Sequence, residues 1–175
     1  SRRLQAGDMR AQLAAVTIGE RNLLALLEKY GKETVSKCTD SLLDLAEAQM
    51  RKFILSIPDG IYSGRSVLED AGHGYGDINI EAGVCVEGDS LSVQLESPPQ
   101  IPYFINSYSA NSLSGVYLGV MMFAQLSPPY NEGLYRPISV DEGEAGTLTN
   151  ATEPAPHANC TTTPSESITD AVRMA

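Results

Sequence analysis

The sequence predicts an α+β fold: a helical hairpin followed by an antiparallel β-meander, a buried helix and a loop-rich region leading into a further helix. Three observations predict it. Apolar residues recur at helical spacing up to residue 54, they alternate with polar residues from 60 to 96, and a strongly apolar stretch covers 109–126. We expect the segments 1–57, 58–140 and 141–175 to be parts of one larger subunit.

The first segment contains two amphipathic helices joined at Gly31. In residues 8–29 and in the helix that follows Gly31, apolar residues recur every three or four positions. Pro58 and the Asp59-Gly60 pair end the second helix. The first stripe is Met9, Leu13, Val16, Leu23 and Leu27, and the second is Val35, Cys38, Leu42, Leu45 and Phe53.

Period-two alternation over 60–96 predicts the meander, with a turn at 87–90 between its last two strands. One face of these two strands carries Ile78, Ile80, Ala82, Val84 and Val86, then Leu91, Val93 and Leu95. The following apolar stretch is long enough for a buried helix. Its small residues Ser114, Gly115 and Gly119 permit close packing against a neighbour.

Residues 141–163 are poor in large apolar side chains and are expected to form a surface loop. Thr163-Pro164-Ser165-Glu166 has the pattern of a capping box with proline at the first helical position, so a helix should begin there. Because only three turns follow, we expect the polypeptide to extend beyond both ends of this sequence.

Composition limits the function classes. The 175 residues carry a formal net charge of −10, which disfavours nucleic acids and anionic membranes as partners. No apolar run approaches the roughly 18 residues of a membrane span, and the first residues lack the apolar core of a signal peptide. Three cysteines without a CxxC spacing indicate reduced thiols, so we expect a cytoplasmic protein.

Few residues have the spacing of a catalytic or metal site. Glu69, Asp70, His73 and Asp77 could hold a divalent metal, but a solvated glycine-rich connection is the interpretation that we prefer. Cys160 precedes a helix and is interpreted as non-catalytic. No nucleotide-binding, nucleophile-elbow or HExxH motif occurs. We therefore predict no metal site and no complete active site in this chain alone.

The segment 127–140, "SPPYNEGLYRPISV", allows two interpretations. The first is a structural turn, in which Gly133 adopts a backbone conformation closed to β-branched residues and a partly buried Glu132 pairs with Arg136. The second is part of an active-site wall, to which Asn131, Glu132 and Arg136 contribute. The residues alone leave both open.

Four stretches resemble the hydantoinase B family, which includes the C-terminal half of 5-oxoprolinases and subunits of acetone and acetophenone carboxylases. In family order they are "GDMRAQLAAVTIGERNLLALLEKYG", "IPDGIYSG", "YNEGLYRPISV" and "SESITDAV". Family members are several times longer, and the upstream segment that supplies a metal site in the carboxylases is not in this sequence.

The resemblance implies an ATP-dependent enzyme that opens cyclic amides of the hydantoin, 5-oxoproline or lactam type. A hydantoinase A type ATP-binding subunit would phosphorylate the substrate, within a hetero-oligomer that also holds the rest of the hydantoinase B type subunit. ATP and a divalent metal would act in the complete enzyme without being bound by this chain. An ATP-dependent ketone carboxylase is the alternative function, and a non-catalytic interaction module is the second alternative.

The implied chemistry creates developing oxyanions, which need hydrogen-bond donors in a dry site. Asn131 and Arg136 are the candidate donors, with Glu132 orienting them. Asn106 and Asn111, near the start of the buried helix, are candidate substrate-binding residues on the same grounds.

Overall fold

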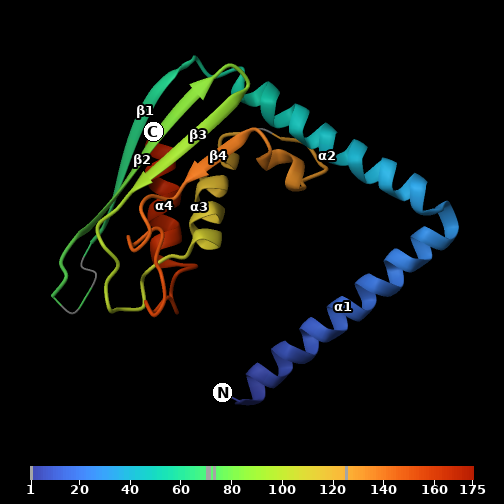
Figure 1. Ribbon diagram of the computed structural model, residues 1–175, viewed down its shortest axis with the longest axis horizontal. Helices are drawn as coiled ribbons and strands as arrows, with labels where there is room; N and C mark the ends of the chain where they lie inside the picture. The colour runs from blue at the N-terminus through green and yellow to red at the C-terminus, as the bar shows by residue number, and fades with distance from the viewer. Residues whose placement is uncertain (1, 70–71, 73, 125) are drawn as a thin grey trace. The chain divides into compact units, whose positions relative to one another are not determined.

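The computed structural model describes residues 2–69, 72, 74–124 and 126–175, and its course is drawn in Figure 1. The chain divides into two compact units, Ser1–Asp44 and Leu45–Ala175. The division falls within a helix, so the second unit contains that helix's last turns. The expected grouping into three segments of a larger subunit stays a prediction.

Two helices, α1 (Arg2–Tyr30) and α2 (Lys32–Ile54), meet at Gly31, which confirms the predicted helix pair. Gly31 has a φ of 79° and its N–H donates to Leu27 O at 2.9 Å, so glycine ends α1 in the left-handed conformation. The expected start near Asp8 is wrong. The helix begins at Arg2 because Arg, Leu, Gln and Ala before Asp8 are all good helix formers.

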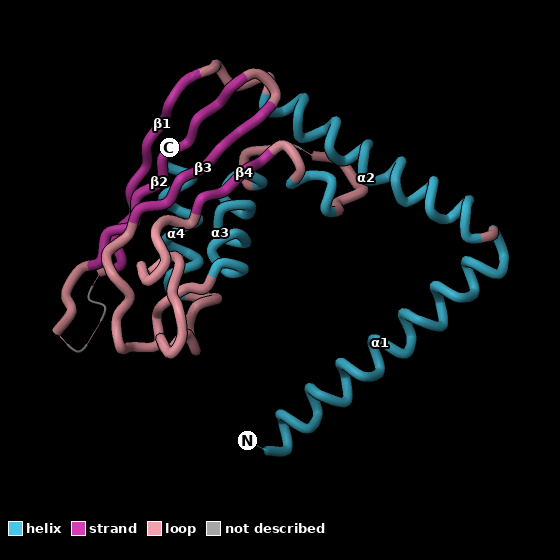
Figure 2. The backbone as a smooth tube through the Cα atoms, viewed as in Figure 1, coloured by secondary structure: helices cyan, strands magenta, loops and turns pink. Residues whose placement is uncertain are grey.

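The sheet lies in the second unit and contains β1 (Gly60–Leu68), β2 (Ile78–Glu87), β3 (Ser90–Glu96) and β4 (Ile138–Asp141). Its strand order is β1-β2-β3-β4, as Figure 2 shows. The first three strands form the predicted antiparallel meander, and β4 joins β3 in parallel. Burial alternates along β2 and β3, and every residue predicted for their inner face is buried.

Two helices cover the inner face of this sheet. α4 (Thr163–Met174) contacts β1 and β2, and α3 (Ser109–Met121) packs against α4. The predicted close packing is confirmed, because a Cβ at Gly115 or Gly119 would lie within 3.0 Å of Ile168 or Val172. Ala46, Met50 and Ile54 of α2 complete the core.

The region before α4 is more buried than expected from its composition. Leu148 and Thr149 are almost fully buried, and Ser107 N–H donates to Leu148 O at 2.8 Å. The buried Ser112 hydroxyl bridges Ser107 Oγ at 2.8 Å and Thr149 O at 2.5 Å. Residues 141–162 are therefore tied to the start of α3 by hydrogen bonds rather than lying loosely on the surface.

The helix predicted after this loop is confirmed, but its capping box is not. Thr162 occupies the cap position without a side-chain hydrogen bond, and Pro164 lies in the first turn. The hydroxyl of Thr163 instead accepts a hydrogen bond from Asn159 Nδ2 at 2.5 Å. Every helix in the described part of the chain is too short or too polar to cross a bilayer.

Candidate functional site

The segment 131–137 forms a tight, ordered turn, as predicted. Its centre is a short 3₁₀ helix, η1 (Glu132–Tyr135), which begins when Asn131 Oδ1 accepts a hydrogen bond from Gly133 N–H at 2.9 Å. Leu134 is fully buried, and the Tyr135 ring stacks on Tyr117 with centroids 4.2 Å apart. The turn is therefore fixed by one side-chain cap and two apolar contacts.

Two details expected of this turn are wrong. Gly133 lies inside the 3₁₀ helix and is not one of the glycines with positive φ, because the Asn131 cap is made with ordinary helical geometry. Glu132 is exposed and does not pair with Arg136. Residues three apart stack in a 3₁₀ helix, whereas Glu132 and Arg136 are four apart and diverge.

The carboxylate partner of Arg136 comes from α2. Arg136 Nη1 lies 3.1 Å from Glu47 Oε2, and the Arg136 side chain is 41% exposed. Glu47 also binds Arg51 at 2.7 Å, and Arg51 binds Asp89 of the β2–β3 turn at 3.0 Å. Four alternating charges thus connect η1, α2 and the sheet.

These charges set the ionisation of Glu47. Hydrogen bonds from Arg51 and then Arg136 hold the pKa of the Glu47 carboxyl below its ordinary value, against a smaller opposing effect of burial. The hydrogen bond to Glu47 also raises the pKa of Arg51. Glu47 is therefore an ionised acceptor that orients two guanidinium groups, not a general acid.

A polar cavity of about 350 Å³ lies beside this network on the outer face of the sheet. Arg51 and Arg136 line it together with Glu87 and several small side chains, among them Cys85, Ser92 and Ser139. Guanidinium groups and hydroxyls are hydrogen-bond donors, so the part of the lining around Arg51 and Arg136 suits a group that carries or develops negative charge. The carboxylate of Glu87 disfavours such a group on its own side of the cavity.

Asn106 and Asn111 lie elsewhere, around the start of α3. Asn106 is fully buried, and its amide group bonds the backbone of Ile101, Tyr103 and Pro156 at 2.7–2.9 Å. Its hydrogen bonds therefore hold loops together. Asn111 Nδ2 donates to Ser107 Oγ at 2.7 Å and to Cys160 O at 2.9 Å. Both residues bond the loop before α4, and these hydrogen bonds do not involve the η1 turn.

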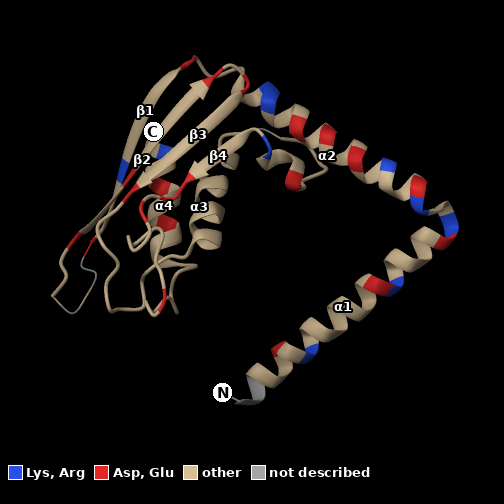
Figure 3. Cartoon of the chain, in the orientation of Figure 1, with Lys and Arg blue, Asp and Glu red and all other residues tan. Residues whose placement is uncertain are grey.

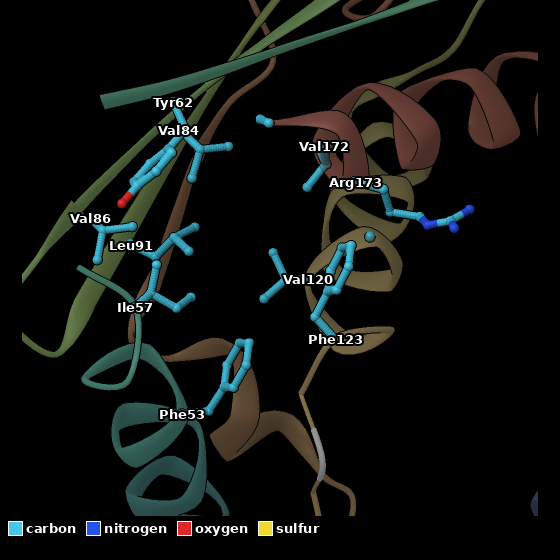
Figure 4. Close-up of a pocket in the computed structure, with 12 residues that line it drawn as sticks. Phe53, Ile57, Tyr62, Val84, Val86, Leu91, Val120, Phe123, Val172 and Arg173 are labelled. Carbon is cyan, nitrogen blue, oxygen red and sulfur yellow. The ribbon is translucent and has the colours of Figure 1, made fainter. Parts of the chain in front are cut away.

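An apolar cavity of about 290 Å³ opens on the inner side of the sheet, between α2, α3 and α4. Figure 4 shows Phe53, Val86, Leu91 and Val120 pointing into it, whereas the Arg173 guanidinium points away. Arg173 pairs instead with Asp170 at 3.0 Å. The cavity can hold an apolar group, but its lining contains no acid or base directed at such a group.

The described residues contain no group of three or more His, Cys, Asp or Glu side chains arranged to bind a metal. Of the loop residues considered from the sequence, Asp70 and His73 lie outside the described residues. The cysteines Cys38, Cys85 and Cys160 are unpaired.

Reasoning from the sequence missed Glu47, Arg51 and Asp89. The spacing of Glu47 and Arg51, four residues apart on a predicted helix, indicates an ion pair. Acidic and basic side chains are interspersed along α2, as Figure 3 shows, so this pair does not stand out from its neighbours. The contact with Arg136 joins residues 89 positions apart and has no local signal.

Comparisons with known proteins identify the family. Residues 2–175 match the family model described as Hydantoinase B/oxoprolinase. The chain is 58% identical over 175 residues to the beta subunit of caprolactamase from Pseudomonas jessenii, covering 100% of this chain and 30% of that protein. It is 31% identical over 172 residues to the B-type subunit of a putative D-/L-hydantoinase from Pseudomonas sp. (strain NS671), covering 88% of this chain and 28% of the relative.

Solved structures with a similar fold include one close relative in sequence and one distant one. The crystal structure of an ATP-dependent caprolactamase from Pseudomonas jessenii matches 97% of this chain and 29% of its own, with a TM-score of 0.89 and 58% identity. A nucleotide-free acetone carboxylase matches 79% of this chain and 20% of its own, with a TM-score of 0.65 and 14% identity, which shows a shared fold alone. The chain spans about a third or less of these relatives, and it belongs to the hydantoinase B/oxoprolinase family.

Proposed function

We propose that this chain is a segment of a hydantoinase B type subunit in an ATP-dependent enzyme that opens cyclic amides, and that a lactam is its substrate class. The observation that carries the proposal is the 58% identity to the caprolactamase beta subunit over all 175 residues. The match covers the whole segment, including η1 and α2, so the local chemistry is expected to be shared.

The proposal includes ATP as a cofactor and a hydantoinase A type ATP-binding subunit as a partner in a hetero-oligomer. The relative is an ATP-dependent caprolactamase whose matching chain is called its beta subunit, which supports both. The proposal also includes a divalent metal in the complete enzyme that is not bound by this segment. Among the described residues, no group of three or more His, Cys, Asp or Glu side chains could hold one. A cytoplasmic location is proposed, supported by the three unpaired cysteines.

Arg136 is the proposed donor for the oxyanion that develops when the activated amide is attacked. It lines the polar cavity, and Glu47 on the rigid α2 fixes its guanidinium. Donors held in place before the reaction stabilise developing charge at little cost in reorganisation. Asn131 is proposed to position Arg136 by fixing the turn, since its side-chain oxygen Oδ1 caps η1. Glu132 is exposed and has no assigned role in this proposal, and Asn106 and Asn111 hold the loop before α4 to the start of α3.

A ketone carboxylase remains the competing function. The acetone carboxylase likeness, at 14% identity, concerns the fold alone. A non-catalytic interaction module is the third candidate, and the closely similar fold of a catalytic relative argues against it.

The experiment that tests the proposal is a substrate panel with the complete subunit and its ATP-binding partner. ATP turnover is measured with caprolactam, a smaller lactam, hydantoin, 5-oxoproline, acetone and acetophenone, each with and without bicarbonate. We expect lactam-dependent ATP turnover that yields the amino acid and is insensitive to bicarbonate. Bicarbonate-dependent turnover of a ketone would contradict the proposal, and no turnover with any substrate would favour the interaction module.

A further inference from the structure

Within the first unit, α1 presents a long apolar surface that the rest of that unit leaves uncovered. We define the α1 stripe as Met9, Leu13, Val16, Leu23, Leu27 and Tyr30. Leu27 is half-buried, and the other five are between 50% and 71% exposed. An exposed apolar row of this length, interrupted at one position, marks an interaction site rather than an ordinary surface.

The spacing of the α1 stripe defines the kind of partner. From Met9 to Tyr30 the positions follow steps of four and three residues, with Glu20 filling the remaining place. This 3.5-residue period is that of a helix that packs along another helix by interlocking side chains. The 21 residue steps between the ends of the stripe correspond to about 32 Å of helix, so the partner is a helix of similar length.

Glu20 decides between possible partners. It lies within the α1 stripe, and no Lys or Arg stands three or four positions from it. A helix laid over the stripe removes the Glu20 carboxylate from water, which is costly unless a basic side chain faces it. In a second copy of α1 aligned along the full stripe, Glu20 would face Glu20 if the helices are parallel. It would lie within about one residue of Glu20 if they are antiparallel, because it stands near the middle of the stripe. Self-association is therefore disfavoured by charge.

We propose that the α1 stripe is covered by an amphipathic helix of the same hydantoinase B type subunit, from polypeptide outside these 175 residues, with a Lys or Arg facing Glu20. The relatives that match this chain are more than three times as long, since it covers 30% of the caprolactamase beta subunit. A helix on the same chain also avoids the loss of translational freedom that a separate partner incurs. The inference rests on the proposed membership of a longer subunit, and its test does not use activity, so the two can fail separately.

Cysteine alkylation tests the coverage within one molecule. Leu13→Cys and Leu23→Cys place thiols on the α1 stripe, and Ala14→Cys and Ala25→Cys are matched controls at exposed positions on the opposite face. Each variant of the full natural subunit is alkylated alone and in the assembled enzyme, and labelled peptides are measured by mass spectrometry so that the native cysteines do not interfere.

We expect the two stripe cysteines to react about tenfold or more slowly than the controls already in the isolated subunit, because reaction then requires local opening. Equal rates on both faces in both preparations would overturn the proposal. Protection that appears only after the partner subunit is added would also overturn it, as would protection that disappears when the subunit is diluted.

A photocrosslinker identifies the covering segment. Benzoylphenylalanine is introduced at position 16 of the full subunit, and the crosslinked peptide is sequenced by mass spectrometry. We expect a peptide of the same polypeptide from outside these 175 residues, with apolar residues three and four apart and a basic residue among them. A peptide from residues 45–175, from a second copy or from another subunit would overturn the proposal.

Discussion

Arg136 and Glu47 form the contact on which the proposed chemistry depends. If Arg136 donates to the developing oxyanion, Arg136→Ala should lower kcat in the assembled enzyme by about 100-fold, with a smaller change in KM. Its effect on folding should be mild, because the side chain is 41% exposed and exposed ion pairs contribute little. Glu132→Ala is the control and should leave kcat nearly unchanged. An Arg136→Ala enzyme with normal kcat would show that the turn is only structural.

Glu47 should make the stability of the fold depend on pH. The two arginines stabilise the carboxylate, so the folded pKa lies below the ordinary value of 4.5. The contribution of Glu47 to the free energy of unfolding is therefore fully present above about pH 4.5 and is lost as pH falls through the folded pKa. Urea unfolding of the wild type and of Glu47→Gln should differ at pH 7, and the difference should shrink as the pH falls below this value. A difference that does not change with pH would contradict the ion-pair account.

Asn106 should matter for folding. Asn106→Ala removes an amide that satisfies backbone groups of three residues, and each buried group left unpaired costs about 1–3 kcal/mol. We expect the free energy of unfolding to fall by roughly 3 kcal/mol, measured by denaturant titration. Asn111→Ala, at a half-buried site where the amide donates to Ser107 and Cys160, should cost less. A fully stable Asn106→Ala variant with a raised KM would instead support the substrate-binding role expected from the sequence.

Among the elements, α4 depends on a glycine in the strand that it crosses. A Cβ at Gly64 of β1 would lie 2.1 Å from Ala171 O, which is backbone and cannot move aside cheaply. Gly64→Ala should therefore destabilise the fold by about 3 kcal/mol, at the upper end of overpacking effects. Gly83→Ala is the matched control, because its Cβ would be 4.0 Å from the nearest atom, and it should change stability by no more than about 0.5 kcal/mol. Equal melting temperatures for the two variants would contradict the packing of α4 on β1.

Helices and strands whose apolar residues recur at a regular spacing were predictable from the sequence. Helix ends and side-chain contacts that depend on tertiary structure were not. Alternation identified the inner residues of β2 and β3 because one face of each strand meets the helices. The Thr163 capping box failed because Asn159, in a folded loop, engages the hydroxyl. Glu132 was paired with Arg136 by sequence distance, whereas the competing carboxylate of Glu47 comes from a different element.

For the molecule as a whole, four short motifs in order were enough to identify the family, because several such motifs rarely occur in the same order by chance. The candidate site was harder to predict. Asn131 and Arg136 were correctly placed in one ordered turn, but the polar cavity is formed jointly by α2, the sheet and η1. The substrate class rests on the 58% identity to a caprolactamase chain and not on any single motif.

The central claim is that this chain is a segment of a lactam-opening enzyme, and a segment exchange tests it most directly. The 175 residues would replace the matching part of the caprolactamase beta subunit of Pseudomonas jessenii. The match covers all of this chain at 58% identity. With the other subunits of that enzyme present, we expect the chimera to assemble and to open caprolactam with ATP at a kcat within about tenfold of the parent, a change of about 1.4 kcal/mol in activation free energy. A chimera that folds and assembles but does not open caprolactam would contradict the account.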